Sequence, residues 1–384
     1  MDFNFTQEQI MFRDSVRKFA EIEMAPGVAE REDSGGFGEK SWDAWKKMSE
    51  FGLVGLSIPS EYGGGEADAL TTVIALEAFA RGSRDLSMCV VWGSHLLLTA
   101  MPIVELGTVL QKEKYLAKMA TGEWMGAFAL TEPEAGSDAT SLKTTAVKKG
   151  NTYVLNGSKT FISNAPIADV FLVFATIDPS LKAKGITIFI VGKNSPGVSL
   201  GKPLKKYDGD GSPTGEIFFE DCVVPAENLL GREGEGFSAL LMSLGWERIA
   251  FAPSIGLMEA NLNLCIEYSK ERKQFGKPIG KYQLVQAMLA EMKMDLDASR
   301  YLVYHLAWMK DNQQFIGLDA AIAKTFVTEA AERSASKAVQ IFGGYGCMRE
   351  YEVGRSLWFS KIATIGGGTS QIQRTIIGRL LTGL

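Results

Sequence analysis

The sequence predicts an α+β protein in which a β domain separates two helical domains. Apolar residues occur at helical spacing over residues 5–120, short β-rich runs bounded by turn residues follow, and helical spacing returns from residue 236 onward. The 384 residues fit two or three domains of about 150 residues each. We therefore expect an N-terminal α-helical domain over 1–120, a middle antiparallel β domain over 121–232 and a C-terminal helical bundle over 233–384.

Signals for helix ends support this division. Thr6 and Gln9 have the spacing of a capping box, and Ser41 is expected to cap a second helix. Further N-terminal helices are expected over 67–80 and 112–120. In the C-terminal part, long helical segments are expected over 237–272, 282–311, 318–344 and 369–381. Their length and limited charge suggest that these helices also pack against other subunits.

The middle domain is expected from six β-rich runs. In chain order they are GAFALT, NTYVLNGSKTFIS, DVFLVFATID, GITIFIVG, GVSLGKPL and GEIFFEDCVV. Gly197 to Gly201 match the Gly-x-Ser-x-Gly spacing of a hydrolase, but the segment continues as a strand, so this class is rejected. Gly234 to Gly236 lack the βαβ unit of a dinucleotide site, and Gly276 to Lys281 lack the length and final Ser or Thr of a P-loop.

The composition argues against several kinds of partner. With 46% apolar and 22% charged residues, the chain is not disordered, and 40 basic against 45 acidic residues give no broad field for nucleic acid or anionic membrane. The sequence holds two histidines, although His is the commonest metal ligand and general base. Because His95 and His305 lie in apolar surroundings, we expect packed residues, no metal site and chemistry that does not depend on His.

The cysteines and the apolar runs indicate the cellular compartment in which we expect the protein. Cys89, Cys222, Cys265 and Cys347 lie far apart with no Cys-x-x-Cys, which predicts neither a zinc knuckle nor disulfides and favours the cytoplasm. The start MDFNFTQEQIMFRD lacks the features of a signal peptide. The longest apolar runs are strand-sized, so no membrane span is expected.

Four segments could bind a ligand. Thr131, Gly136 and Ser137 lie in a loop between strands that can offer hydroxyl and N–H groups to a phosphate or a polar heterocycle. Phe161 and Ser163 share a strand face and could hold a flat ring, although for this segment taken alone ordinary strand alternation is the favoured explanation. Arg272, at a helix end, is either a phosphate ligand or a solvated cap. The glycines of QIFGGYG either admit a ligand close to the backbone or simply end a helix.

Together, segments along the whole chain resemble the acyl-CoA dehydrogenase family. They are MDFNFTQEQIMFRDSVRKFA, IPSEYGG, LTEPEAGSD, NGSKTFISNA, ERKQFGKPI, QIFGGYG and GGGTSQIQR, in that order. The resemblance implies the family fold, with a C-terminal four-helix bundle, and a homotetramer with one FAD per subunit.

The resemblance also implies the residues that bind FAD. In the middle domain they are Phe128, Leu130, Thr131, Gly136, Ser137, Phe161 and Ser163, with Ser163 near the flavin N5 edge. A neighbouring subunit's FAD is expected to contact Arg272, Gln274, Phe275, Gln340 and Gly344, and further FAD contacts are Gln283 and Gly343. Thr369 and Gln371 match the loop over the adenosine phosphates.

Desaturation of an acyl thioester requires a base for the α-proton while a hydride leaves the β-carbon for flavin N5. Many family members carry a Glu where this chain has Gly367, so the base must come from elsewhere or the protein is catalytically silent. A branch that includes isovaleryl-CoA and long-chain dehydrogenases places Glu at the position of Glu247. Glu247 also lies in an apolar helix, where an unpaired carboxylate is costly. A direct pair with Arg248 is expected to be poor, because adjacent helix residues point about 100° apart.

Further features concern the substrate. Gly367 is expected to donate its N–H to the thioester carbonyl, with Ser137, Arg248 and Gly368 as substrate contacts. The glycines at 366 and 367 suggest room for a branched or cyclic acyl group. Gly245 and the acidic segment Lys206 to Ser212 depart from the family where CoA phosphates might be held. An acyl or prolyl group on a carrier protein therefore remains an alternative to acyl-CoA, and the electron acceptor is either an electron-transfer flavoprotein or oxygen.

Overall fold

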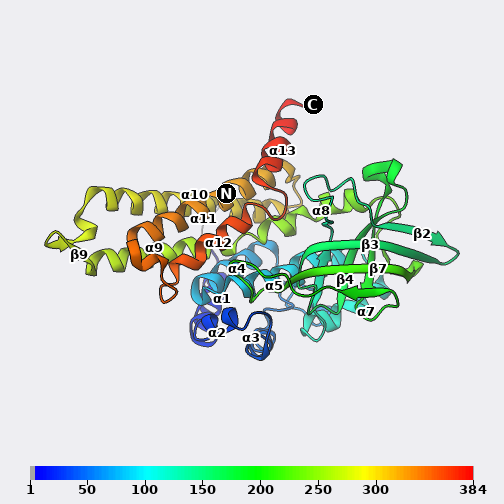
Figure 1. Cartoon of the computed structure of the whole chain (residues 1–384), viewed down its shortest axis with the longest axis horizontal. Helices are drawn as coiled ribbons and strands as arrows, with labels where there is room; N and C mark the ends of the chain where they lie inside the picture. Colours follow the sequence, from blue (N-terminus) through cyan, green and yellow to red (C-terminus); the bar gives the residue numbers. More distant parts are fainter. Residues whose placement is uncertain (1–4, 384) are drawn as a thin grey trace.

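The computed structural model describes residues 5–383, apart from the side chains of residues 242–244. It has the α+β architecture expected from the sequence, with helices before and after a β domain (Figure 1). The N-terminal helices are α1 (Gln7–Phe19), α2 (Val28–Asp33), α3 (Glu39–Glu50), α4 (Ala69–Ser83), α5 (Leu86–His95), α6 (Met101–Leu106) and α7 (Val109–Ala120).

One of the two predicted helix caps is correct. Thr6 and Gln9 form the capping box of α1, with reciprocal hydrogen bonds between side chains and backbone. The prediction for Ser41 is wrong, because α3 begins at Glu39 and its N-cap is Gly38. The earlier start places Ser41, Trp45 and Met48 on one buried face of the helix, and this packing determines where α3 begins.

Within the described residues, the middle segment forms an eight-stranded sheet in the order β6-β7-β3-β2-β4-β5-β8, with β1 beside β4. Most neighbours are antiparallel, as expected, whereas β1 and β2 both run parallel to β4. The strands are β1 (Gly126–Ala129), β2 (Thr145–Lys149), β3 (Thr152–Ser163), β4 (Val170–Thr176), β5 (Ile186–Gly192), β6 (Val198–Leu200), β7 (Thr214–Pro225) and β8 (Leu229–Leu230). The six predicted runs form strands, and β2 and β8 were missed.

Strand β4 connects the sheet to the helices. All seven of its residues are buried, which explains why the strand is a continuous apolar run. Phe171 and Val173 face the core of the β domain, whereas Leu172 and Phe174 face the core shared with the helices. The sheet is therefore packed against the helical part of the molecule through this strand.

The C-terminal part contains long helices that lie side by side (Figure 1). The expected helix over 237–272 is divided in two, because Pro253 has no N–H to donate and starts a new helix after a turn at Ala250–Ala252. Helices α9, α10, α11 and α12 pack as a bundle, and α13 follows a glycine loop. The helices are α8 (Gly236–Ile249), α9 (Pro253–Glu271), α10 (Gln283–Asp311), α11 (Gly317–Phe342), α12 (Val353–Ala363) and α13 (Ser370–Thr382), and the short strands β9 (Lys273–Gln274) and β10 (Lys277–Pro278) form a hairpin after α9.

Both histidines are packed residues, as the sequence predicted. His95 is fully buried, and its ring nitrogens lie 3.0 Å from the Met119 carbonyl oxygen and 3.1 Å from the Gly126 amide nitrogen. Burial lowers the pKa of His95 to about 4. The ring of His305 stacks on Trp308. Among the residues that the structure describes, no group of His, Cys, Asp or Glu side chains is arranged to hold a metal ion.

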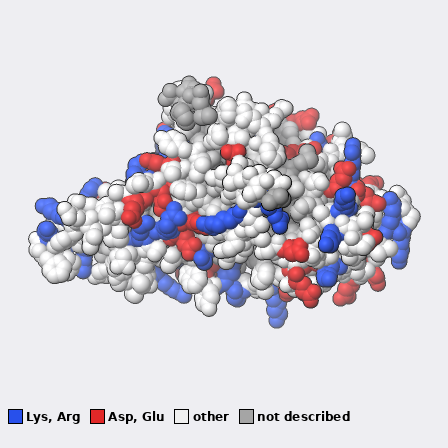
Figure 2. Space-filling model, turned by 90° about the horizontal axis from the view of Figure 1, so that it is seen from above, with Lys and Arg blue, Asp and Glu red and all other residues white. Residues whose placement is uncertain are grey.

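Two helical stretches, Leu86–Leu106 and Gly236–Glu271, are long and apolar enough to cross a membrane. However, 83% and 67% of their most apolar windows are buried within the protein, which is the pattern of core helices. On the face shown in Figure 2, acidic and basic side chains are interspersed. This surface agrees with the nearly balanced charge of the sequence.

Candidate active site

Glu247 and Gly367 lie next to each other in the structure. They are the two positions at which the sequence could have placed the catalytic carboxylate. Glu247 lies in the last turn of α8, and Gly367 lies in the loop between α12 and α13. A Cβ atom added to Gly367 would lie 2.8 Å from Glu247 Oε1, 3.2 Å from Arg248 Nη1 and 3.2 Å from the Phe251 ring. The Glu247 carboxylate therefore occupies the space beside position 367 into which a side chain there would project.

The packing of α8 directs Glu247 toward this loop. Its neighbours Trp246 and Ile249 are buried, and the Trp246 indole N–H donates to Glu105 Oε1 at 2.8 Å. The Glu247 side chain remains 17% exposed. Phe251 reaches the same place because it lies in the turn between α8 and α9. From the sequence, Phe251 was expected only as one of the apolar residues around Glu247, and its place beside Gly367 was not predicted.

Arg248 lies against Glu247, and the contact is close although the sequence predicted a poor pair. Its Nη1 is 3.1 Å from Glu247 Oε1, because the long side chain at the end of α8 can turn back toward its neighbour. The guanidinium is 5% exposed, yet Nε and Nη1 have no hydrogen-bond partner among the described residues. The contact is thus close but poorly aligned, and two buried donors face the site without an acceptor.

The glycine loop presents an unpaired donor. Gly367 has a φ of +64°, which favours glycine, and its carbonyl accepts from Gln373 Nε2 at 3.0 Å. The Gly367 N–H makes no hydrogen bond to another described residue. Consequently, a carboxylate, a guanidinium and a free main-chain donor converge at one place, which is an arrangement suited to moving a proton next to a carbonyl group.

A second part of the site lies where β1 and β3 end. Thr131 and Ser163 are half-buried, and their hydroxyl groups form no hydrogen bond within the described part of the chain. Phe161 is 69% exposed and has a φ of +57°. The pairing of β3 with β7 shifts between Lys159 and Ile162. The Phe161 ring is therefore directed by a bulge, and not by the simple strand alternation assumed from the sequence.

A buried ion pair that the sequence did not predict holds this region together. Lys159 Nζ lies 2.6 Å from Glu132 Oε1 and donates to the Leu130 carbonyl at 3.0 Å. Burial lowers the pKa of Lys159 to about 8, and Glu132 opposes this shift. Glu132 also accepts from the Thr144 N–H at 3.0 Å. A lysine that faces inward from an apolar strand was the available signal in the sequence.

The remaining middle-domain predictions lie around these residues. The Phe128 ring packs on Phe174, with the ring centres 4.9 Å apart, so part of it is used in the core. Gly136 and Ser137 are exposed in the loop after β1, and a Cβ at Gly136 would meet nothing within 4 Å. Thr369 accepts from the Ile372 N–H and caps α13, while Gln371 is exposed.

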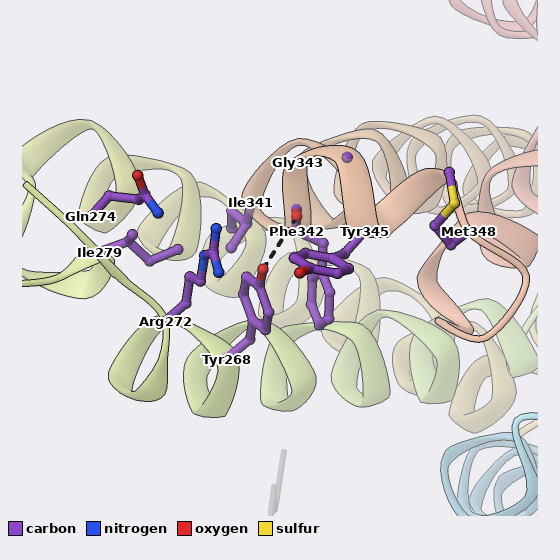
Figure 3. Close-up of a pocket in the computed structure, with 10 residues that line it drawn as sticks. Tyr268, Arg272, Gln274, Ile279, Ile341, Phe342, Gly343, Tyr345 and Met348 are labelled. Carbon is purple, nitrogen blue, oxygen red and sulfur yellow. Dashed lines mark hydrogen bonds between the residues drawn. The ribbon is translucent and has the colours of Figure 1, made fainter.

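Another group of predicted residues lines a hollow of about 540 Å³ at the end of the bundle (Figure 3). Four of them lie there together: Arg272, Gln274, Gly343 and Gly344. The Arg272 guanidinium lies 5.5 Å from the centre of the Tyr345 ring, and this ring covers one side of the guanidinium. Phe275, at the tip of the hairpin, is 94% exposed, and Gln283 and Gln340 are exposed nearby without lining the hollow.

These two groups are far apart within one chain. Figure 1 shows the β9 hairpin at one end of the molecule and strands β2 and β3 at the other. The free hydroxyl groups of Thr131 and Ser163 beside the exposed Phe161 ring fit the polar edge and the flat face of a flavin, and the hollow with Arg272 fits a phosphate-bearing group. The residues present therefore suit FAD, but one chain alone does not bring both groups to the same place.

Two departures noted in the sequence have packing explanations. Gly245 packs against the side chains of Lys310 and Ile316. A Cβ atom added to Gly245 would lie 2.8 Å from Lys310 Cδ and 2.9 Å from Ile316 Cδ1. In the acidic segment, Asp210 accepts from the Lys206 N–H at 2.9 Å. The Gly211 N–H donates to Glu32 at 3.2 Å, so the segment is tied to α2. Both features therefore have roles within the chain that do not involve a nucleotide.

Three family models match nearly the whole chain. They are the acyl-CoA dehydrogenase N-terminal domain over residues 6–123, the middle domain over 127–222 and the C-terminal domain over 234–382. The mitochondrial isovaleryl-CoA dehydrogenase of Oryza sativa is 42% identical over 99% of this chain and 92% of that protein.

Solved structures are also similar. The prolyl acyl carrier protein oxidase AnaB is 41% identical, with a TM-score of 0.96, over 99% of this chain and 100% of that one. The FAD complex of PigA is 34% identical, with a TM-score of 0.96, over 100% of this chain and 99% of that one. These likenesses extend from end to end, so the similarity concerns the complete fold and not a shared domain.

Proposed function

The chain belongs to the acyl-CoA dehydrogenase family, and from this premise we propose that it dehydrogenates an acyl thioester at the α,β-bond with Glu247 as the base. Its enzyme class is that of the flavin-dependent acyl-thioester dehydrogenases, and its cofactor is FAD. The observation that carries the assignment of the base is the position of the Glu247 carboxylate, 2.8 Å from where a side chain of residue 367 would begin.

In the proposed reaction, Glu247 removes the α-proton and holds it on its carboxylate. The Gly367 N–H donates to the thioester carbonyl oxygen, and this contact strengthens as negative charge develops there. Arg248, with two unpaired buried donors, stabilises the carboxylate or an oxygen of the acyl group. Bound FAD would supply the acceptor for the hydride that leaves the β-carbon. Closure of the site by the acyl chain excludes water and strengthens each of these interactions.

The positions of the FAD residues support a homo-oligomer, proposed here as a tetramer. Thr131, Phe161 and Ser163 of the middle domain would hold the flavin, while Arg272 and Gly344 line the hollow at the end of the bundle. A second copy that brings its bundle end to the flavin-binding end of the first would complete each site. The exposed Phe275 beside Arg272 gives this end an apolar surface suited to such contact. The four unpaired cysteines support a reducing compartment, and we propose the cytoplasm.

Acyl-CoA is the proposed substrate class, with a carrier-protein thioester as the alternative suggested by the similarity to AnaB. The structure changes the earlier inference about acyl shape. The space beside Gly367 is filled by Glu247 and Phe251, so the loss of a side chain there does not enlarge the acyl site. Near Gly366 an added Cβ would meet only the Ile362 carbonyl oxygen at 3.8 Å, which leaves space on that side of the loop.

Anaerobic loss of the yellow flavin absorbance tests the function. We expect the purified protein to contain FAD and one or more thioesters in a panel of straight, branched and cyclic acyl-CoA and acyl-carrier-protein substrates to bleach it. Reoxidation by oxygen with stoichiometric peroxide would assign an oxidase, whereas a requirement for an electron-transfer flavoprotein would assign a dehydrogenase. If the thioesters bind tightly but none reduces the flavin, the protein is a silent relative and the proposed reaction is wrong.

Moving the base from Glu247 to position 367 should restore part of the activity. In the double variant Glu247→Gly/Gly367→Glu, the new side chain would enter the space vacated by the old one. A left-handed backbone at residue 367 costs a non-glycine residue about 1–2 kcal/mol, so we expect turnover about 10-fold or more below the natural enzyme. Steady-state kinetics should place the double variant at least about 10-fold above Glu247→Gly. Equal activities of these two variants would contradict a shared carboxylate position.

A further inference from the structure

Lys324 is a buried lysine that neither the proposed reaction nor the FAD site uses. It lies in the first third of α11 and is 1% exposed. Its ammonium donates to the main-chain carbonyls of Gly368, at 2.7 Å, and Thr364, at 3.4 Å. No carboxylate forms an ion pair with it in the part of the chain that the structure describes. Burying a cation without such a partner is costly, so the two hydrogen bonds to main-chain carbonyls must offset part of that cost.

The two carbonyls mark the two ends of the glycine loop. Thr364 is the C-cap of α12, and Gly368 directly precedes Thr369, the N-cap of α13. One ammonium group therefore ties both ends of the loop that carries Gly367. The middle of the loop is held separately, since the Gly367 carbonyl accepts from Gln373 Nε2 at 3.0 Å. None of these contacts uses the Gly367 N–H, which makes no hydrogen bond to another described residue.

Lys324 also supports the opposite side of the site. Its Nζ lies 5.5 Å from the centre of the Phe251 ring, and the same ring comes within 3.2 Å of an added Cβ at Gly367. Burial and the charge of Arg248 lower the pKa of Lys324 to about 8, whereas Glu247 and Glu329 oppose this shift. Lys324 is thus close enough to the Glu247 and Arg248 pair to interact with it electrostatically, while its hydrogen bonds go to the loop.

We propose that Lys324 is a positioning residue that fixes the glycine loop, so that the Gly367 N–H stays directed at the thioester carbonyl while Glu247 removes the α-proton. This inference rests on the proposed function. It differs from a purely structural role because loss of the two hydrogen bonds would move the donor without removing it, and a displacement of about 1 Å can slow such a step about 100-fold.

The test measures removal of the α-proton by itself. Holoenzyme whose flavin has been reduced with dithionite cannot take a hydride, so exchange of the α-proton in deuterated water reports on the base and the carbonyl donor. Butyryl-CoA, isovaleryl-CoA and prolyl-pantetheine serve as probes, and exchange is followed by NMR. The variants are Lys324→Met, which removes the donor, and Lys324→Gln, which keeps an N–H donor. The control is Lys361→Met, since Lys361 also joins α12 to α11 but through Glu332, at 2.9 Å.

For Lys324→Met we expect exchange to fall about 10- to 100-fold, with FAD content and melting temperature close to those of the natural protein. Lys324→Gln should recover several-fold of this loss, and Lys361→Met should exchange within about 2-fold of the natural protein. Unchanged exchange in Lys324→Met would overturn the inference. It would also be overturned if Lys324→Met and Lys324→Gln both lost FAD or stability, because Lys324 would then be a folding residue. A natural enzyme that exchanges none of the probes would instead refute the proposed function.

Discussion

Replacing Glu247 with glutamine should lower kcat about 1,000- to 10,000-fold while FAD stays bound. The amide has nearly the shape of the carboxylate, so it should preserve the packing beside Gly367 and Arg248 but cannot accept the α-proton. Anaerobic stopped-flow measurement of flavin bleaching by the best thioester of the panel would give the rate of the chemical step. The flavin absorbance of the purified variant would show whether cofactor binding is intact.

A matched variant on the same helix separates catalysis from a general effect of lost charge. Glu235 is the exposed N-cap residue of α8, far along the helix from Glu247, and it is not part of the proposed site. We expect Glu235→Gln to bleach at about the natural rate, since surface substitutions away from a site have small effects. If Glu247→Gln keeps more than about a tenth of the natural rate, the base is another group, because general-base catalysis contributes about 100-fold or more.

The fold could be predicted because its signals are local. The buried strands β4 and β5 appear in the sequence as continuous apolar runs, and the capping box at Thr6 fixes the start of α1. Ser41 shows the limit of such signals, because burial of the helix face against Trp45 and Met48 overrides a favourable cap residue. The division of the long helix at Pro253 could have been expected from the absence of an N–H on proline.

The site was less predictable because it is made by tertiary contacts. The sequence placed a carboxylate at Glu247 and a glycine at Gly367, but only the fold shows that they share one space. The roles assigned to individual FAD residues stay predictions, although the fold places Thr131 beside β3, where its carbonyl accepts from the Thr160 N–H, and Arg272 near Gly344. Lys324 could not have been selected from the sequence, since its partners are main-chain carbonyls that lie 40 and 44 residues later in the chain.

Substitution of Lys159 by methionine should cause the largest loss of stability, about 3–5 kcal/mol in the free energy of unfolding. The change leaves the Glu132 carboxylate buried without its cation, and it removes the donor that holds the Leu130 carbonyl. Because Leu130 and Thr131 begin the loop expected to bind FAD, the variant should also bind FAD more weakly. Denaturant unfolding, with and without added FAD, would measure both effects.

A double variant tests whether the loss comes from the unpaired charge. In Lys159→Met/Glu132→Gln the amide oxygen can still accept from the Thr144 N–H, but no buried charge remains. We expect the double variant to be more stable than Lys159→Met, because replacing both partners of a buried pair costs less than removing one of them. If instead both variants unfold at the same denaturant concentration, the Leu130 carbonyl and packing account for the loss. If Lys159→Met is as stable as the natural protein, the ion pair does not stabilise the flavin-binding end of the sheet.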